Sequence, residues 1–178
     1  IEDFYNIDVP NNGTLERLLE LSDKAGVDKV VIHSPATTPH QVQSVNNFIY
    51  DCTQKYPERV IGFMTLHPDY ENINDEVERC IALGLKGVKL HPDFQRFHID
   101  DHKAFCIYEA ISGRLPLLVH TGDFRYQWSK PERMAKVMDE FPAMTVIGAH
   151  FGGWSEWDDA ARVFKGKNIY VDTSSTMY

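Results

Sequence analysis

The chain has 178 residues, of which 43% are hydrophobic and 25% charged, a composition typical of one soluble globular domain spanning residues 1–178. Its formal net charge is −8, with 18 basic against 26 acidic side chains and no Lys or Arg run, which argues against a nucleic-acid partner. No stretch of 18 apolar residues occurs and the N-terminus is unlike a signal peptide, so we expect a cytoplasmic protein that does not cross a membrane.

Six short apolar runs, rich in Val, Ile and Leu, predict strands that are buried on both faces. In chain order these runs are 27–34, 60–67, 85–91, 115–120, 144–150 and 168–175. Segments with helical spacing lie before the first run, at 14–26, and between later runs, at 73–84, 100–113, 130–141 and 155–166. A helix between successive strands predicts parallel strands joined by right-handed crossovers.

Several residues mark the ends of these helices. Thr14 and Ser155 stand where N-caps are expected, although Arg17 occupies the position of a capping-box Glu. Pro131 suits a first helical turn, and Gly26 suits a helix end. These signals support the helix boundaries given above.

The three cysteines are Cys52, Cys80 and Cys106, each in a segment of helical character. An odd number without paired spacing suits neither a disulfide framework nor a cysteine-based zinc site. We therefore predict reduced, packed thiols.

Two α/β architectures fit this alternation, an open doubly wound sheet and a closed (β/α)₈ TIM barrel. The open sheet has no support from a G-x-G-x-x-G or P-loop motif after any strand. The barrel is supported by the strand ends, where functional residues of such barrels lie. These ends read Ser34, His67, His91, His120, His150 and Asp172. Because six strands are fewer than eight, we expect strands two to seven of a distorted barrel, incomplete at both ends.

Strand alternation predicts which side chains face the barrel interior. An inward His120 would place Leu118 inside, with Leu117 and Val119 against the helices. An inward His150 would place Val146 and Gly148 inside, and Ile147 and Ala149 outside.

The same alternation places Lys89 inside whenever His91 is inside. An isolated buried ammonium costs several kcal/mol, so Lys89 must be paired, neutralised or modified. A salt bridge and a role near a metal or a substrate carboxylate both remain open.

The segments GVKLHP, LPLLVHTGD, VIGAHFGG and NIYVDTSS together resemble the amidohydrolase superfamily, in its amidohydrolase 2 branch. That branch consists of TIM-barrel metal-dependent hydrolases and also contains decarboxylases of aromatic and related acids. The resemblance implies a distorted barrel with one or two divalent metals, most commonly Zn²⁺, with Mn²⁺ as the alternative.

The resemblance also assigns residues. His120 matches the metal-ligand histidine of the fifth strand, and His150 matches the sixth-strand histidine, a metal ligand or a catalytic group. Lys89 stands on the fourth strand, where some members carry a carbamylated lysine, a modification that we do not expect here.

The chain departs from the family pattern at two positions. No two of its eight histidines are two residues apart, so the first-strand H-x-H pair is missing. The eighth-strand aspartate is also missing, because Asp172 belongs to the preceding strand. Asp172 is instead a candidate to orient a ligand histidine.

We expect substrate contacts from three further residues. His91 ends a strand, and Arg125 and Trp128 belong to the aromatic loop 123–132, which suits a planar or carboxylated substrate. The alternative is that this loop is only a hydrophobic cover. Trp154 and Trp157 could line a pocket or form an oligomer contact, which leaves a homo-oligomer open.

The sequence thus favours a metal-dependent hydrolase that uses a metal-activated water on a C–N or C–O bond of a small molecule. Its catalytic candidates are His150 and Lys89, and its metal candidates are His120 and His150. A decarboxylase or hydratase of a carboxylated, in particular aromatic, substrate is the alternative within the enzyme class. An inactive fragment that lacks metal ligands is the alternative of another class.

Overall fold

Every predicted apolar run contains a short parallel strand, and the run over 60–67 contains two. The computed structural model describes residues 2–5 and 11–176. Its strands are β1 (Val30–Ile32), β2 (Val60–Gly62), β3 (Met64–Thr65), β4 (Val88–Leu90), β5 (Leu117–Val119), β6 (Val146–Gly148) and β7 (Ile169–Val171).

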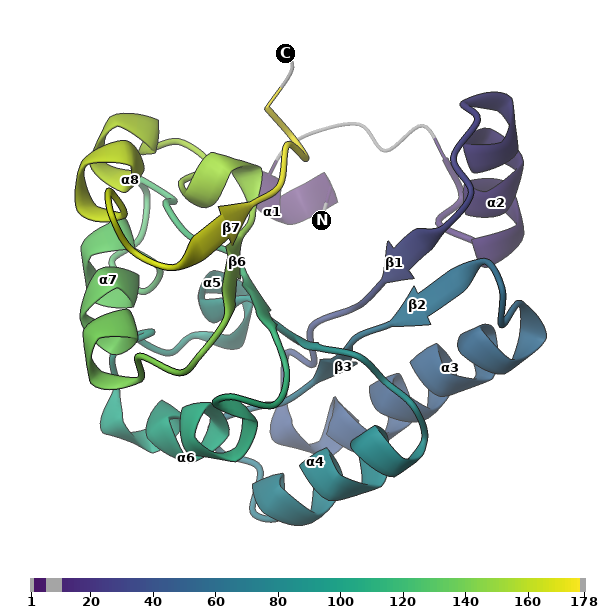
Figure 1. Ribbon diagram of the computed structural model, residues 1–178, viewed down its shortest axis with the longest axis horizontal. Helices are drawn as coiled ribbons and strands as arrows, with labels where there is room; N and C mark the ends of the chain where they lie inside the picture. Colours follow the sequence, from purple (N-terminus) through teal and green to yellow (C-terminus); the bar gives the residue numbers. More distant parts are fainter. Residues whose placement is uncertain (1, 6–10, 177–178) are drawn as a thin grey trace.

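Helices follow most of the strands and lie on their outer side (Figure 1). The α-helices are α1 (Glu2–Tyr5), α2 (Leu15–Lys24), α3 (Val42–Lys55), α4 (Ile73–Ala82), α5 (Pro92–Gln95), α6 (His102–Ile111), α7 (Pro131–Glu140) and α8 (Trp157–Val163). Two 3₁₀ turns are η1 (Pro39–Gln41) and η2 (His150–Gly152). None of the helices in the described part of the chain is long and apolar enough to cross a bilayer.

The strands are parallel and adjacent in chain order. β1 pairs with β2, and β3 to β7 pair consecutively. The chain changes partner at Phe63, whose N–H donates to the Ile32 carbonyl, while the next N–H, of Met64, donates to the Gly87 carbonyl. The run 60–67 thereby contacts β1 first and β4 afterwards, which divides it into two strands.

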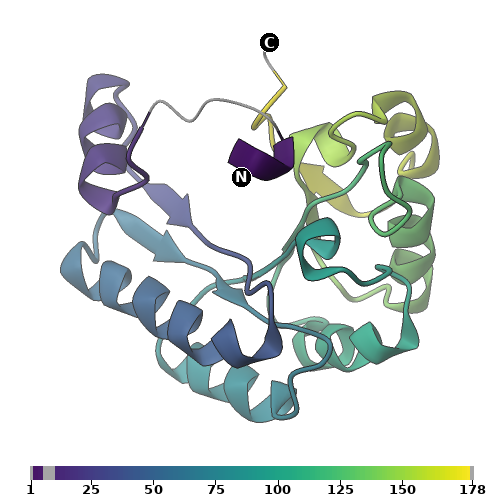
Figure 2. The same cartoon turned by 180° about the vertical axis from the view of Figure 1, so that it is seen from behind.

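This arrangement confirms the predicted fold class. Parallel strands in sequential order with an outer helix layer form an arc of a (β/α)₈ TIM barrel (Figures 1 and 2). β1 and β7 lie at the two ends of the arc. Because the strands are parallel, all their carboxyl ends lie on one side of the barrel, and the site forms there.

The core has an outer and an inner part. The outer part lies between strands and helices and contains Val88, Leu117 and Val146. The inner part is smaller and contains Leu118 and Ala149 among its buried residues. Leu118 therefore faces inward, as predicted from His120.

The predicted alternation of the sixth strand is wrong. Ile147 is in register with Leu118 and packs in the inner part with Ala149, while Val146 packs in the outer part. The reason is that β6 ends at Gly148 and His150 has a φ of 59°, so the alternation of the strand does not extend to His150.

The helix caps agree with the sequence at α2 and α7 but not at α8. The Thr14 hydroxyl accepts the Arg17 N–H, and Pro131 is in the first turn of α7. The N-cap of α8 is Glu156, not Ser155. The Ser155 hydroxyl instead accepts the Phe124 N–H and donates to the Gly122 carbonyl. It thereby joins the loop that follows β5 to the loop that follows β6.

The cysteines are all free thiols. Cys52 and Cys80 are buried, as predicted, whereas Cys106 is exposed. The expectation of a packed thiol is therefore wrong for Cys106, which lies on the outer face of α6.

Candidate active site

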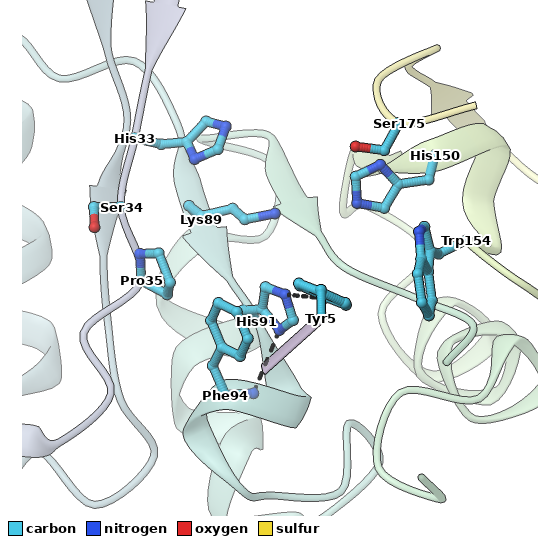
Figure 3. A pocket seen from close by; sticks show the side chains of 10 residues that line it. All are labelled: Tyr5, His33, Ser34, Pro35, Lys89, His91, Phe94, His150, Trp154 and Ser175. Carbon is cyan, nitrogen blue, oxygen red and sulfur yellow. Dashed lines mark hydrogen bonds between the residues drawn. The ribbon is translucent and has the colours of Figure 1, made fainter. Parts of the chain in front are cut away.

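A cavity of about 300 Å³ opens at the carboxyl ends of the strands (Figure 3). Strand ends and the short helices that follow them supply most of its walls. It is lined by Tyr5, His33, Ser34, Pro35, Lys89, His91, Phe94, His150, Trp154 and Ser175. Four of these residues, Lys89, His91, His150 and Trp154, are candidates from the sequence.

Lys89 reaches the cavity from the middle of β4, and its side chain points between His33 and His150 (Figure 3). It is only 5% exposed, and among the described residues no acceptor lies within hydrogen-bonding distance of its Nζ. Burial lowers the pKa of Lys89 to about 8, and the carboxylate of Asp172 opposes that shift. A buried amine without a hydrogen-bond partner is suited to an anionic ligand.

His120 lies directly after β5 and is 1% exposed. Its ring stacks on that of His91, with centroids 4.1 Å apart and planes 8° apart. The ring of His150 meets it edge-on, at 5.1 Å and 68°. Burial, and then the neighbouring His91, hold the pKa of His120 well below its usual value. The neutral imidazole that results is the form that binds a metal.

His150 is held by residues that follow β7. Its Nδ1 lies 2.8 Å from the Ser174 carbonyl, so an Nδ1–H donated there leaves the lone pair on Nε2. The Asp172 carboxylate accepts the backbone N–H of His150 at 3.0 Å. The same carboxylate also accepts the Ser174 hydroxyl, whose oxygen lies 2.9 Å from His150 Nδ1. Asp172 therefore orients the backbone of His150 directly and its ring through Ser174. Burial lowers the pKa of His150, and the bond to Ser174 opposes the shift.

The donor groups around His120 fit a divalent metal. One donor atom each of His91, Asp93 and His120 lies within 4.8 Å of the others, and all three residues are buried. Both His120 nitrogens and Asp93 Oδ1 are buried without a hydrogen-bond partner in the described structure. Buried polar atoms without hydrogen-bond partners lower the stability of the fold unless an ion or a water molecule binds them.

His91 is the weakest ligand of this group. Imidazole lone pairs lie in the ring plane, so two stacked rings direct their lone pairs side by side and not toward one point. The nitrogens of His91 are also engaged, with the Tyr5 hydroxyl at 3.0 Å and the Phe94 N–H at 3.4 Å. The crossed rings of His120 and His150 are better placed, because two imidazoles on one tetrahedral zinc have their centres about 5 Å apart.

Arg125 and Trp128 do not line the cavity. The Arg125 guanidinium forms an ion pair with buried Asp123 at 2.7 Å and donates to the Phe4 carbonyl at 2.9 Å. It lies over four aromatic rings, at 5.0 to 5.4 Å from their centres. Trp128 stacks on Tyr126. The donors of Arg125 are thus used within the protein, and both residues stabilise the loop beside the cavity.

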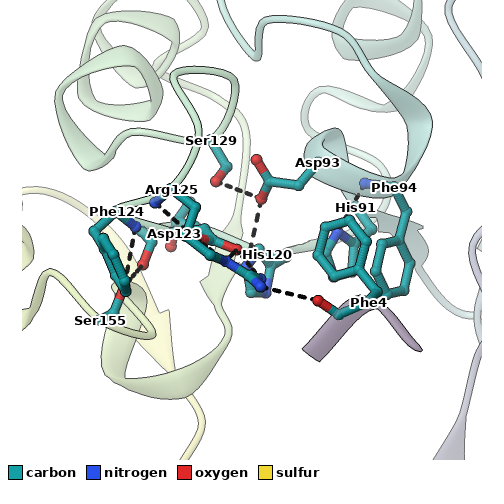
Figure 4. Close-up of polar contacts among 12 residues, drawn as sticks. Phe4, His91, Asp93, Phe94, His120, Asp123, Phe124, Arg125, Ser129 and Ser155 are labelled. Carbon is teal, nitrogen blue, oxygen red and sulfur yellow. Dashed lines mark hydrogen bonds and ion pairs between the residues drawn. The ribbon is translucent and has the colours of Figure 1, made fainter. Parts of the chain in front are cut away.

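Asp93 and Tyr5 are site residues that sequence reasoning missed. Asp93 follows the strand-end His91-Pro92 and lies in α5, close to His120 (Figure 4). An acidic residue just after a strand end was the available signal for Asp93. Tyr5 contacts His91 from α1, and no local pattern indicates that contact.

Comparisons with known proteins agree with this architecture. A family model described as "Amidohydrolase" matches residues 8–177. None of the curated proteins compared with the chain matches it.

Three solved structures illustrate the structural similarity. An uncharacterised TIM-barrel protein from Bordetella bronchiseptica is 19% identical, with a TM-score of 0.76, over 93% of this chain and 61% of that one. A 5-carboxyvanillate decarboxylase from Novosphingobium aromaticivorans, complexed with manganese and 4-hydroxy-3-methoxy-5-nitrobenzoic acid, is 20% identical, with a TM-score of 0.68, over 92% and 57%. A 4-oxalomesaconate hydratase from Rhodopseudomonas palustris is 19% identical, with a TM-score of 0.63, over 89% and 59%. The chain spans less than two thirds of each of these structures.

Proposed function

The chain belongs to the amidohydrolase family, and from this premise we propose that its cavity binds a small carboxylated substrate beside a divalent metal. The observation that carries the proposal is the buried amine of Lys89, which faces the cavity without an acceptor among the described residues. A substrate carboxylate would supply that acceptor, and a charge-assisted hydrogen bond in a buried site is strong.

Aromatic side chains supply the rest of the binding surface. Phe94 and Trp154 line opposite parts of the cavity, and Tyr5 lies between them and contacts both rings. Flat apolar walls beside a single cationic group favour a planar substrate with one carboxylate. An aromatic acid has this chemistry.

The metal would be held by His120, and the Asp93 carboxylate lies beside that donor. A bound divalent ion supplies Lewis acidity toward a carbonyl or carboxylate oxygen of the substrate. Imidazole and carboxylate donors suit Zn²⁺ and Mn²⁺ alike, and manganese is the ion named in the decarboxylase structure described above.

We propose a lyase reaction, decarboxylation or hydration, as the first candidate. Lys89 would hold the carboxylate while His150 exchanges a proton at Nε2 with the reacting carbon or with water. The bond from Nδ1 to Ser174 keeps the ring in place during that exchange. The structural similarity to a decarboxylase and a hydratase supports this class.

Hydrolysis of a C–N or C–O bond is the second candidate, favoured by the family description. In that reaction His150 Nε2 would take a proton from water. The two candidates share the cavity and differ in product, so the products decide between them.

Calorimetric titration of the full chain, loaded with Mn²⁺, with 4-hydroxy-3-methoxy-5-nitrobenzoic acid tests the binding proposal. We expect Lys89→Met to weaken binding by at least about tenfold, because a charge-assisted bond contributes about 1.5–3 kcal/mol. The matched control is Lys86→Met, an exposed lysine three residues earlier. Equal affinity of the two variants, or equal affinity of the wild type for the methyl ester, would contradict the proposal.

Product analysis then tests the reaction class. The metal-loaded chain is incubated with a panel of hydroxybenzoic acids and with a panel of aromatic amides and esters. Release of CO₂ or addition of water supports the lyase, and release of amine or alcohol supports the hydrolase.

A further inference from the structure

His120 and Asp93 form a buried pair that the proposed reaction does not by itself require. The Nε2 atom of His120 lies 3.4 Å from Oδ2 of Asp93 (Figure 4). Each residue is 1% exposed. A hydrogen bond between a carboxylate and an imidazole is stronger when both groups are shielded from water in this way.

The position of the Asp93 carboxylate is set by two different loops. Asp93 belongs to α5, which follows β4, and its Oδ2 accepts the Ser129 hydroxyl at 2.6 Å from the loop that follows β5. Gln95 anchors α5 further, because its amide donates to the carbonyls of Ala36 and Leu66. The carboxylate is therefore fixed before any ligand binds.

Among the described residues, the one basic side chain within ion-pair distance of the Asp93 carboxylate is the neutral imidazole of His120. The nearby guanidinium of Arg125 is committed to Asp123 by a bidentate contact. The imidazole of His120 is thus the group that this carboxylate is placed to contact.

We propose that Asp93 is a positioning residue that fixes the tautomer and orientation of His120. Oδ2 lies 3.4 Å from Nε2, a separation at which no hydrogen bond is formed in the present geometry, and we infer that it attracts the ring proton to Nε2. The lone pair is then left on Nδ1, at the opposite edge of the ring. The Ser129 hydroxyl, which donates to the same Oδ2, holds the carboxylate in that position. Metal-binding histidines commonly donate their second N–H to a carboxylate in this manner. The value of the Nδ1 lone pair for metal binding rests on the proposed function, whereas the tautomer itself does not.

Long-range ¹H–¹⁵N NMR spectroscopy of the metal-free full chain reads the tautomer directly, with His120→Gln to assign the ring signals. We expect wild-type His120 to be in the Nε2–H form. Asp93→Leu, which removes the acceptor at similar volume, should shift His120 to a mixture of tautomers. Asp93→Asn, which retains an oxygen acceptor, should keep most of the Nε2–H form. The matched control is Asp139→Asn, because Asp139 pairs with Lys167 on an exposed helix face.

An Nδ1–H form in the wild type, or an unchanged Nε2–H form in Asp93→Leu, would overturn the inference. If Asp93→Leu does not fold, Asp93→Ala is read in the same way. Zn²⁺ affinity measured against a chromophoric chelator gives the second readout, with an expected loss of about 10- to 100-fold in Asp93→Leu.

The two proposals fail in distinguishable ways. A wild-type chain that binds no metal but whose His120 tautomer depends on Asp93 would refute the metal-dependent function and keep the inference. A chain that binds metal, but whose His120 tautomer is the same in the wild type and in Asp93→Leu, would refute the inference alone.

Discussion

The burial of Lys89 carries an electrostatic cost to the stability of the fold. Its ammonium is buried against apolar walls, and its pKa falls from 10.5 to about 8. At neutral pH the lysine is charged in both the folded and the unfolded chain, so the full cost of burying the charge opposes folding. A substrate carboxylate would offset this cost in the complex.

We predict that Lys89→Met stabilises the protein at pH 7, by on the order of 3 kcal/mol, while it weakens carboxylate binding. Between the folded pKa of about 8 and the unfolded value of 10.5, the unfolded chain binds more protons. The wild type therefore gains stability as pH rises through this range, and the advantage of the variant disappears. Urea unfolding at several pH values measures the difference. A variant less stable than the wild type at pH 7 would contradict the account.

At the scale of elements, short caps and tight turns hold the helices and loops that surround the site. α6 begins at Asp101, whose carboxylate accepts the Lys103 N–H at 3.1 Å. We predict that Asp101→Ala lowers the free energy of unfolding by about 1 kcal/mol, whereas Asp101→Ser retains most of it. Thermal unfolding of the two variants checks this, and equal losses would show that the cap is not the cause.

The loops that follow β5 and β6 contact each other at Gly122. This glycine has a φ of 81°, and a Cβ there would lie 2.5 Å from Gly153 Cα. The Ser155 N–H also donates to the Gly122 carbonyl at 2.8 Å. Gly122 therefore permits the close approach that brings His120 and His150 together.

We predict that Gly122→Ala destabilises the protein more than Gly26→Ala does. Gly26 has a similar φ of 69°, but a Cβ there meets no atom within 4 Å. Gly26→Ala should cost about 1–2 kcal/mol for its backbone conformation alone. Gly122→Ala should cost about 1–3 kcal/mol more, because two backbone segments must separate. Chemical denaturation of both variants gives the comparison, and similar losses would argue against a close contact.

For the whole molecule, the buried histidines predict that the free energy of unfolding falls at acidic pH. Burial lowers the pKa values of His67, His91, His120 and His150. These rings remain neutral in the folded chain, while the same rings in the unfolded chain take up protons below about pH 6.5. The contribution of these neutral rings to stability is therefore fully present above that pH and is lost as the pH falls below it.

We predict a slope of up to about 1.4 kcal/mol per pH unit for each such histidine, measured by urea unfolding in the presence of a chelator. His120→Gln should reduce the slope, and His40→Gln, at an exposed position, should leave it unchanged. A wild-type stability that is flat between pH 7 and about 5 would contradict the prediction.

Local patterns were sufficient to predict the barrel and the side of it on which the site lies. Apolar runs alternate with amphipathic segments along the whole chain. Few arrangements other than parallel strands inside a layer of helices bury both the strands and the apolar faces of the helices. Because parallel strands end on one side, His91, His120 and His150 had to lie near one another. The periodicity of the sequence and the residues at the strand ends together carry this information.

Only the tertiary structure decided which groups touch. The left-handed turn at His150 ended the alternation of β6, and the direction of its ring depends on Ser174, 24 residues away. The Asp93–His120 contact and the pairing of Arg125 with Asp123 depend on how loops from different strands pack. Beyond the end of a strand, the direction of a side chain depends on the dihedral angles of the turn and on hydrogen bonds to distant residues. Neither produces a periodic pattern in the sequence.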